Sequence, residues 1–501
     1  MRHIPATMAT QHPDNACAPY WEEDGDGFVS TYEEVAECFS SYRDLGCEEY
    51  MWDWEGKYVE EAVVERLFHG HYEYFRRHPL GKEKFLTFRI PNIWQEKGHS
   101  LSRAMMGMLT AEDVARSLDL HAPPLFEVIL PMTTGADQIM HINRLFSKLS
   151  KFSSALFGHR CTLPRINVMP LFEGVDHMFA SRPLLNKFLA DYRATYKTAP
   201  DHLRLHIARS DPALNSGMVA AVVAGKFMLS EFYRFGEDHG LPVFPAVGAG
   251  LLPFRGGLAP DRLPDFFRQY AGVRTAYIQS AFRYDYPLAQ AKAAIRRLNR
   301  ELPLTKPDRF DRPADKREAQ ELCRHFAAAY RRVAEKIAPT INRLALSVPR
   351  RRERKLHIGL FGYSRRLGSK RLPRAIPFTA GLYSIGLPPE FLGTGHGLAA
   401  AAAAGLNLER FYPILRADLV RAGRYLNKKN LDAMAARGPA WRRLREDVSL
   451  TEKHLGLELG PKMDSDFAHR EITTQALRKF LRGTNISEEV TASGKIRRSL
   501  G

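Results

Sequence analysis

The 501-residue sequence contains no apolar run close to the roughly 20 residues that a membrane-spanning helix needs. Its first residues, MRHIPATMATQHPDN, lack the apolar centre of a secretory signal. We therefore expect a soluble, cytoplasmic protein with no membrane partner.

Cysteine is also scarce. The five cysteines are odd in number and widely spaced, and none forms the C-x-x-C pair typical of zinc or redox sites. They are Cys17, Cys38, Cys47, Cys161 and Cys323. This pattern argues against a disulfide framework and indicates reduced thiols.

Acidic residues are outnumbered, with 56 Asp and Glu against 73 Lys and Arg, for a formal charge of +17. Such an excess suits either a nucleic-acid partner or small anionic substrates. The densest basic run, RRRERK at 350–355, comes with no nucleic-acid-binding motif, which favours a solvated loop. We expect no nucleic-acid partner, and keep a basic binding protein on a barrel scaffold as the alternative.

Short β-rich runs alternate along the chain with segments of helical pattern. Alternation predicts parallel strand pairing, and eight units predict closure into a barrel. The runs are 49–55, 85–92, 125–132, 166–173, 203–210, 242–250, 275–282 and 356–364. The expected fold is therefore α/β, a (β/α)8 TIM-type barrel with additional helices. An open doubly wound sheet competes, but no G-x-G-x-x-G follows the first run.

These patterns divide the chain into three parts. Residues 1–48 form an N-terminal segment carrying TQHPDN, and 49–374 form the barrel with a helical insertion at 286–347. Residues 375–501 form a helix-rich C-terminal region packed on the barrel. We expect the last dozen residues, polar and basic, to be mobile.

Polar side chains collect where the expected strands end, and in a barrel those ends share the face that carries active sites. Glu173 and Asp211 follow neighbouring strands and are candidates to bind one Mg2+ together with water and substrate oxygens. Each of them is equally well explained as a surface acid or an arginine partner. Other polar residues at these ends are Asp53, Glu55, Arg89, Asn92, Arg209, Arg255, Gln279, Arg283 and Arg365.

Arginines at this face favour an anionic substrate, because guanidinium groups pair with carboxylate and phosphate. Arg255 lies in LLPFRGG, where Gly256 and Gly257 let the backbone approach a ligand, unless they only form a turn. His12, in TQHPDN, is suited to proton transfer, although a loop histidine is more often structural.

Several motifs in this order resemble those of archaeal-type phosphoenolpyruvate carboxylase. They are TQHPDN, YMWDWEGKYV, FLTFRIPNIW, PPLFEVILPM, PLFE, ARSDPALNSG and PFRGGLAP, with SRRLGSK and RAIPF similar to basic motifs of the larger bacterial and plant enzymes. The resemblance covers most of the chain.

The resemblance implies an anaplerotic enzyme that carboxylates phosphoenolpyruvate with bicarbonate, irreversibly, to oxaloacetate and phosphate through carboxyphosphate and a metal-stabilised enolate. It implies Mg2+ or Mn2+ on Glu173 and Asp211, no biotin, and a homotetramer. His12 and Arg255 would be catalytic. The expected substrate-binding residues, including Arg209 and Gln279 from their strand-end positions, are Arg89, Arg209, Gln279, Arg365, Arg374, Gly256 and Gly257.

Two departures and one alternative stay open. Leu214 stands where the larger enzymes have a lysine, and Ala249 stands nearest to an extra arginine of their glycine-rich loop, so Arg209 is a candidate for the missing charge. The alternative keeps the barrel, metal and enolate but makes the protein a lyase or phosphotransferase acting on phosphoenolpyruvate or pyruvate.

Overall fold

The structure is a computed structural model. It describes residues 2–22, 25–55, 57–95, 99–158, 161–353, 366–368 and 370–501.

Eight parallel strands close into a barrel in chain order, so the predicted (β/α)8 fold is confirmed. The strands are β1 (Thr7–Thr10), β2 (Glu49–Asp53), β3 (Phe85–Arg89), β4 (Glu127–Leu130), β5 (Asn167–Phe172), β6 (Leu203–Ala208), β7 (Val243–Gly248) and β8 (Thr275–Ile278). β1 completes the barrel by pairing with both β2 and β8.

The sequence prediction was wrong about which segment supplies the eighth strand. The barrel begins with β1, inside the expected N-terminal segment 1–48, and closes at β8. The expected strand at 356–364 lies outside the described residues, and the barrel closes without it. Only four residues long, TMAT is too short to show a strand period, and its pairing with a strand about 270 residues away is invisible to local patterns.

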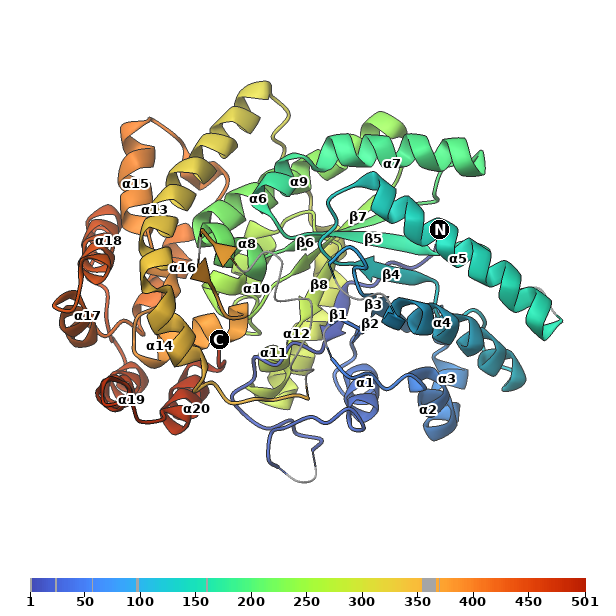
Figure 1. Cartoon of the computed structure of the whole chain (residues 1–501), viewed down its shortest axis with the longest axis horizontal. Helices are drawn as coiled ribbons and strands as arrows, with labels where there is room; N and C mark the ends of the chain where they lie inside the picture. The colour runs from blue at the N-terminus through green and yellow to red at the C-terminus, as the bar shows by residue number, and fades with distance from the viewer. Residues whose placement is uncertain are drawn as a thin grey trace.

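Helices surround the barrel and continue beyond it (Figure 1). Those that follow β1 to β8 are α1 (Glu34–Arg43), α2 (Val63–Gly70), α3 (Tyr72–Arg77), α4 (His99–Ser117), α5 (Ala136–Phe157), α6 (Val175–Phe179), α7 (Ser181–Tyr196), α8 (Ser210–Ser216), α9 (Met218–His239), η1 (Pro253–Arg255), α10 (Leu263–Gln269), α11 (Ser280–Tyr284), α12 (Leu288–Glu301) and α13 (Pro313–Ala345). The last two confirm that the insertion at 286–347 is helical.

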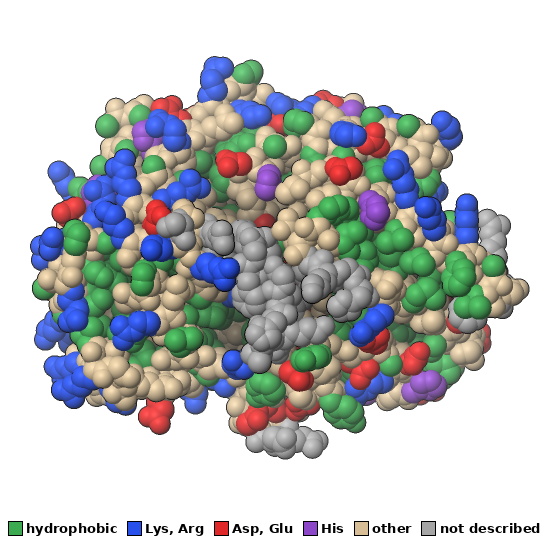
Figure 2. Space-filling model, viewed as in Figure 1, with side chains coloured by type: hydrophobic (Ala, Val, Ile, Leu, Met, Phe, Trp, Pro, Cys, Tyr) green, Lys and Arg blue, Asp and Glu red, His purple; other side chains and the backbone are tan. Residues whose placement is uncertain are grey.

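The C-terminal region is helical, as predicted, and gathers on one side of the barrel while the N-terminus lies on the other (Figure 1). After a small hairpin of β9 (Arg366–Leu367) and β10 (Lys370–Arg371), its elements are α14 (Ala375–Ser384), η4 (Pro389–Phe391), α15 (Thr394–Ala403), α16 (Leu415–Gly423), α17 (Lys428–Ala435), α18 (Pro439–Leu455), α19 (Asp464–Leu481) and α20 (Ser487–Arg497). Many Lys and Arg side chains cover this side of the molecule (Figure 2).

The end of the chain corrects a second expectation. Leu500 is fully buried, and its backbone N–H donates to the carbonyl of Asp14 at 2.8 Å. The Ser499 hydroxyl donates to the same carbonyl at 3.1 Å. The last dozen residues are thus packed against the N-terminal loop rather than mobile, because their backbone and hydroxyl groups find partners that only tertiary structure supplies.

Strand alternation decides what faces the barrel interior. On β6, Leu203, Leu205 and Ile207 pack in the outer core with the helices, while Ala208 belongs to the interior cluster. That cluster consists of Met8, Met51, Ile129, Met169, Leu171, Ala208, Ala246 and Tyr277. These buried side chains form a packed core inside the barrel.

A buried ion network lies at the amino-terminal ends of the strands. Arg204 donates to Glu49 at 2.7 and 2.9 Å and to Glu127 at 2.5 Å, and also to the hydroxyl of Thr275 at 3.0 Å. The three charged side chains are at most 3% exposed. In barrels of this kind, active sites lie at the opposite end, where the strands reach their carboxyl ends.

Within the described part of the chain, no helix is both long enough and apolar enough to cross a membrane.

Candidate active site at the carboxyl ends of the strands

The loop after β1 places His12 at the mouth of the barrel. Its ring Nδ1 lies 2.9 Å from the Thr10 hydroxyl at the end of β1, and its carbonyl accepts the N–H of Ser280 at 3.3 Å. Ser280 begins α11, directly after β8. The half-buried His12 therefore lies beside the ends of two adjacent strands, whereas the sequence placed it upstream of the barrel. Its part in the reaction stays a prediction.

Asp14, two residues further on, joins this loop to the rest of the mouth. Its carboxylate accepts from Arg255 Nη1 at 3.0 Å and from the N–H of Ala281 at 2.7 Å, which caps α11. Burial raises the pKa of Asp14, against the opposing effects of Arg255 and of the Ala281 N–H. Sequence reasoning missed Asp14, although it lies inside the quoted TQHPDN motif.

Arg255 is the centre of the hydrogen-bond network at the mouth. Besides Asp14, its guanidinium donates to Gln279 Oε1 at 2.6 Å, to the Ser210 hydroxyl at 3.2 Å and to the carbonyl of Gly501 at 2.5 Å. These partners come from four separate parts of the chain. The contact confirms that Arg255 and Gln279 lie together, and it adds Ser210, which sequence reasoning did not single out.

The glycines after Arg255 shape the turn that carries it. Gly256 has φ +126°, and a Cβ there would lie 2.6 Å from the Cβ of Ala249, so only glycine fits. The N–H groups of Gly256 and Gly257 donate to the carbonyls of Pro253 and Leu252 at 3.0 and 3.1 Å. Both groups therefore close the turn, and substrate binding by these glycines stays a prediction.

Arg89, at the end of β3, is held by one acid at the end of β2 and one just after it. It forms a two-point pair with Asp53, Nε to Oδ1 at 2.9 Å and Nη2 to Oδ2 at 2.6 Å, and its Nε lies 3.3 Å from Glu55 Oε2. Gln11 accepts the N–H of Asp53 at 2.9 Å. The predicted arginine is thus fixed in orientation beside the loop that carries His12.

Glu173 and Asp211 follow two adjacent, paired strands. Leu171 pairs with His206, and Phe172 with Ile207, so Glu173 directly follows β5 at the level where β6 ends. Asp211 lies in the first turn of α8, and its charge acts on Arg255 by raising the pKa of that guanidinium, which burial lowers. Both carboxylates therefore belong to the same end of the barrel.

The donor set fits a hard divalent cation. Glu173 is 7% exposed, and two carboxylates leave coordination positions for water and substrate oxygens, as Mg2+ prefers. Among the described residues, no three His, Cys, Asp or Glu side chains gather as a metal centre. The protein would thus contribute few ligands of its own.

Arg209 is held by a residue at the end of α10. It follows Ala208, which faces the interior, and its Nε donates to the Tyr270 hydroxyl at 2.6 Å at the end of α10. Its two terminal nitrogens are buried and have no hydrogen-bond partner among the described residues. Arg209 is the N-cap of α8, where the backbone is already helical, and its contact with Tyr270 was not evident from the motif.

A model of one family matches residues 4–501, and its description is phosphoenolpyruvate carboxylase. The chain belongs to the phosphoenolpyruvate carboxylase family. Similar proteins with that name include those of Leuconostoc mesenteroides (38% identical; 95% of this chain and 94% of that one), Metallosphaera sedula (39%; 92% of each) and Methanospirillum hungatei (40%; 85% and 87%). The resemblance seen in the motifs is confirmed, archaeal relatives included, and the chain is an enzyme of the carboxylase, or lyase, class.

The remaining predicted residues lie in or near the C-terminal region. Arg374 is the N-cap of α14, which packs against α8, the helix that carries Asp211. Arg365 lies outside the described residues.

Leu214, at the lysine position of the larger carboxylases, is fully buried, and its carbonyl accepts the Tyr330 hydroxyl at 2.7 Å. The family's lysine position is therefore part of the core in this carboxylase.

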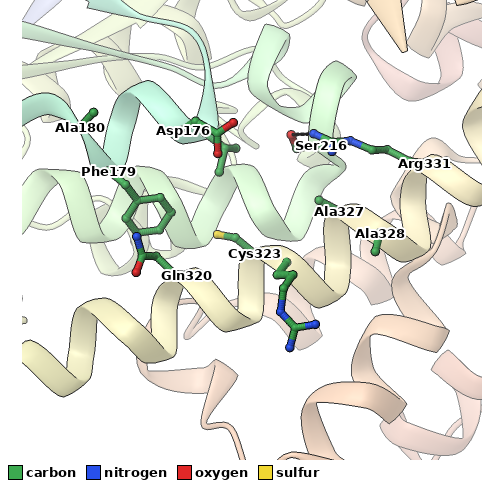
Figure 3. Close-up of a pocket in the computed structure, with 11 residues that line it drawn as sticks. Asp176, Phe179, Ala180, Ser216, Gln320, Cys323, Ala327, Ala328 and Arg331 are labelled. Atoms are coloured by element: carbon green, nitrogen blue, oxygen red, sulfur yellow. Dashed lines mark hydrogen bonds between the residues drawn. The ribbon is translucent and has the colours of Figure 1, made fainter. Parts of the chain in front are cut away.

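A separate hollow of about 610 Å3 lies outside the barrel, between α6, α8 and α13 (Figure 3). Phe179 and Cys323 point into it, and Arg331 reaches the Ser216 hydroxyl at its rim. No predicted site residue lines this hollow, so we place the reaction of the carboxylase at the barrel mouth instead.

Proposed function

We propose that this chain carboxylates phosphoenolpyruvate with bicarbonate to give oxaloacetate and phosphate, an irreversible reaction that replenishes four-carbon acids. One observation carries the proposal: Glu173 and Asp211 follow paired strands at the same mouth where Arg255 is fixed among Asp14, Ser210 and Gln279. Acids for a cation and guanidinium groups for an anion therefore lie at one face.

Glu173 and Asp211 would hold Mg2+ or Mn2+ through their carboxylate oxygens, and the proposal needs no biotin. When bound, such a cation supplies positive charge that stabilises the oxygens of the anionic substrate. Arg89 and Arg255 contribute fixed charge to the same end, and their acid partners hold both guanidinium groups in place before substrate arrives.

The reaction begins with attack by a bicarbonate oxygen on the phosphorus of phosphoenolpyruvate. The bond between phosphorus and the enol oxygen breaks, which leaves carboxyphosphate and the enolate of pyruvate. His12, at the mouth, accepts the proton of carboxyphosphate, and loss of phosphate releases carbon dioxide. Carbon 3 of the enolate then attacks carbon dioxide and forms oxaloacetate.

Exclusion of water matters because a protonated enolate is only pyruvate. The burial of Arg255 and Gln279, at 1% and 4% exposure, supports a closed site around the enolate. The packing of residues 499 and 500 on the Asp14 loop further limits access from that side.

A coupled assay of the purified protein tests the function. Oxaloacetate and phosphate should form in equal amounts, and only when phosphoenolpyruvate, bicarbonate and Mg2+ are all present. Turnover of phosphoenolpyruvate that does not depend on bicarbonate would point to the rival lyase or phosphotransferase. Salt-sensitive binding to DNA or RNA without turnover would point to the nucleic-acid alternative.

The family resemblance further supports a cytoplasmic homotetramer, which sedimentation of the native protein tests. A stable monomer or dimer would contradict it.

A further inference from the structure

The turn that presents Arg255 is held from outside the barrel. Its backbone closes on itself, because Arg255 N–H donates to the Leu252 carbonyl at 2.9 Å and Gly250 N–H donates to the Arg255 carbonyl at 2.8 Å. The N–H of Phe254, near the start of η1, has no partner inside the turn, as is usual at the start of a helix. That N–H donates to Glu390 Oε1 at 2.9 Å.

Glu390 belongs to η4 in the C-terminal region, 136 residues further along the chain. The same oxygen accepts the Tyr383 hydroxyl of α14 at 2.8 Å. A second contact reinforces the anchor, since the ring of Phe254 stacks on Phe378, also of α14, with centroids 5.5 Å apart. The C-terminal region thus holds the residue next to Arg255 by both backbone and ring.

We propose that Glu390 is a positioning residue, which acts through the Phe254 N–H to hold the Pro253–Arg255 turn and therefore the guanidinium that serves the reaction. The inference rests on the proposed function, because it takes Arg255 to act on the substrate. Glu390 itself touches no reacting group.

The other carboxylate oxygen of Glu390 makes its charge state responsive to pH. The side chain is fully buried, and Oε2 has no hydrogen-bond partner among the described residues. Burial raises the pKa of Glu390 to about 7, against the bonds from Phe254 and Tyr383 that lower it. A charged acceptor forms a shorter and stronger hydrogen bond than a neutral one, so ionisation tightens the grip on the turn.

The short helix η4 packs against α14, α15, α16, α18 and η1. On α18, Asp447 accepts the N–H of Gly393, two residues beyond η4, at 3.0 Å, and it also contacts the ring of His396 on α15. Tyr383 of α14 donates to it, and Asp418 of α16 raises its pKa by repulsion. On α20, Arg497 is attracted to Glu390, which raises the pKa of that arginine against the lowering effect of burial. The barrel side offers the backbone N–H of Phe254.

The test compares the pH dependence of kcat for Glu390→Gln and the parent enzyme, from pH 6 to 9 with saturating bicarbonate. The amide still accepts the Phe254 N–H but stays neutral. We expect kcat to match the parent within about twofold at pH 6 and to fall about five- to tenfold below it at pH 8.5, with less change in KM. A purely structural bond predicts that the pH profiles of kcat for the two proteins coincide after scaling. That result would overturn the proposal.

Two further variants keep the result interpretable. Tyr383→Phe removes a bond that favours the charged form, so the midpoint of the pH profile should move upward; an unmoved midpoint counts against Glu390. Asp466→Asn is the matched control, a buried acid of the C-terminal region that accepts the N–H groups of Lys462 and Met463. Its profile should follow the parent. A parent without bicarbonate-dependent activity would instead refute the proposed function.

Discussion

Asp14→Asn tests whether one buried ion pair holds the active site together. The substitution keeps the shape of the side chain and an oxygen for the N–H of Ala281, which lies 2.7 Å away in the parent. It removes the charge 3.0 Å from Arg255 Nη1 and brings an amide N–H towards that donor. Arg255 would then keep its charge in a place that water does not reach.

The size of the effect follows from burial. Asp14 and Arg255 are at most 1% exposed, and removing one member of a buried pair costs about 3–5 kcal/mol. Arg255 keeps its bonds to Ser210, Gln279 and Gly501, so we expect the lower end, about 3 kcal/mol. That cost falls on the free energy of unfolding. Because the guanidinium also loses the carboxylate that orients it, we expect kcat/KM for phosphoenolpyruvate to fall about a hundredfold, as when one oxyanion-type donor is removed.

The assay follows oxaloacetate formation, with the unfolding temperature measured in parallel. Asp466→Asn is again the control, because Asp466 is a fully buried acid that also pairs with an arginine, Arg424, at 2.8 Å. Its kcat/KM should stay within about twofold of the parent.

Unfolding of the double variant, which combines Asp14→Asn with Arg255→Gln, is the measurement that could refute this reasoning. Burial raises the pKa of Asp14 and lowers that of Arg255, so desolvation outweighs the attraction within the pair. The double variant, in which both side chains are neutral, should therefore have an unfolding temperature at least as high as that of Asp14→Asn alone. It should remain inactive. Strictly additive losses of stability would show that the two side chains do not depend on each other, and our reasoning would fail.

Three other predictions concern the proton acceptor, the metal and the supporting core. His12→Asn should still consume phosphoenolpyruvate but release pyruvate, and normal oxaloacetate output would remove His12 from the mechanism. Glu173→Ala or Asp211→Ala should abolish metal-dependent turnover, with partial rescue by excess Mn2+; unchanged metal activation would contradict their role. Burial favours a raised pKa for Glu37, but Arg352 and Arg283 lower that pKa to about 2. The ionised Glu37 carboxylate therefore stabilises the fold above pH 4.5, and this contribution is lost as the pH falls towards 2. Glu37→Gln should thus cost about 3 kcal/mol at pH 7 and almost nothing near pH 2, as measured by urea unfolding.

Local sequence patterns were sufficient for most of the barrel and for the shared location of two acids, Glu173 and Asp211, at one end of it. Runs such as LRLHIARS and INVMPLFE show a strand followed by a polar residue, and parallel pairing then brings Glu173 and Asp211 to one face. The motif order was sufficient for the family, because many short matches in register rarely arise by chance. Both inferences need only neighbouring residues and their order.

The tertiary structure decided what depends on distant contacts and on side-chain direction. It supplied β1, whose partner β8 lies about 270 residues away, and the pair of Asp14 with Arg255, which are 241 residues apart. It also turned Arg209 towards Tyr270 and brought Glu390 to the Phe254 N–H. A sequence pattern records which residues could make such bonds, but the partner and the direction follow only when the barrel closes and the C-terminal helices pack upon it.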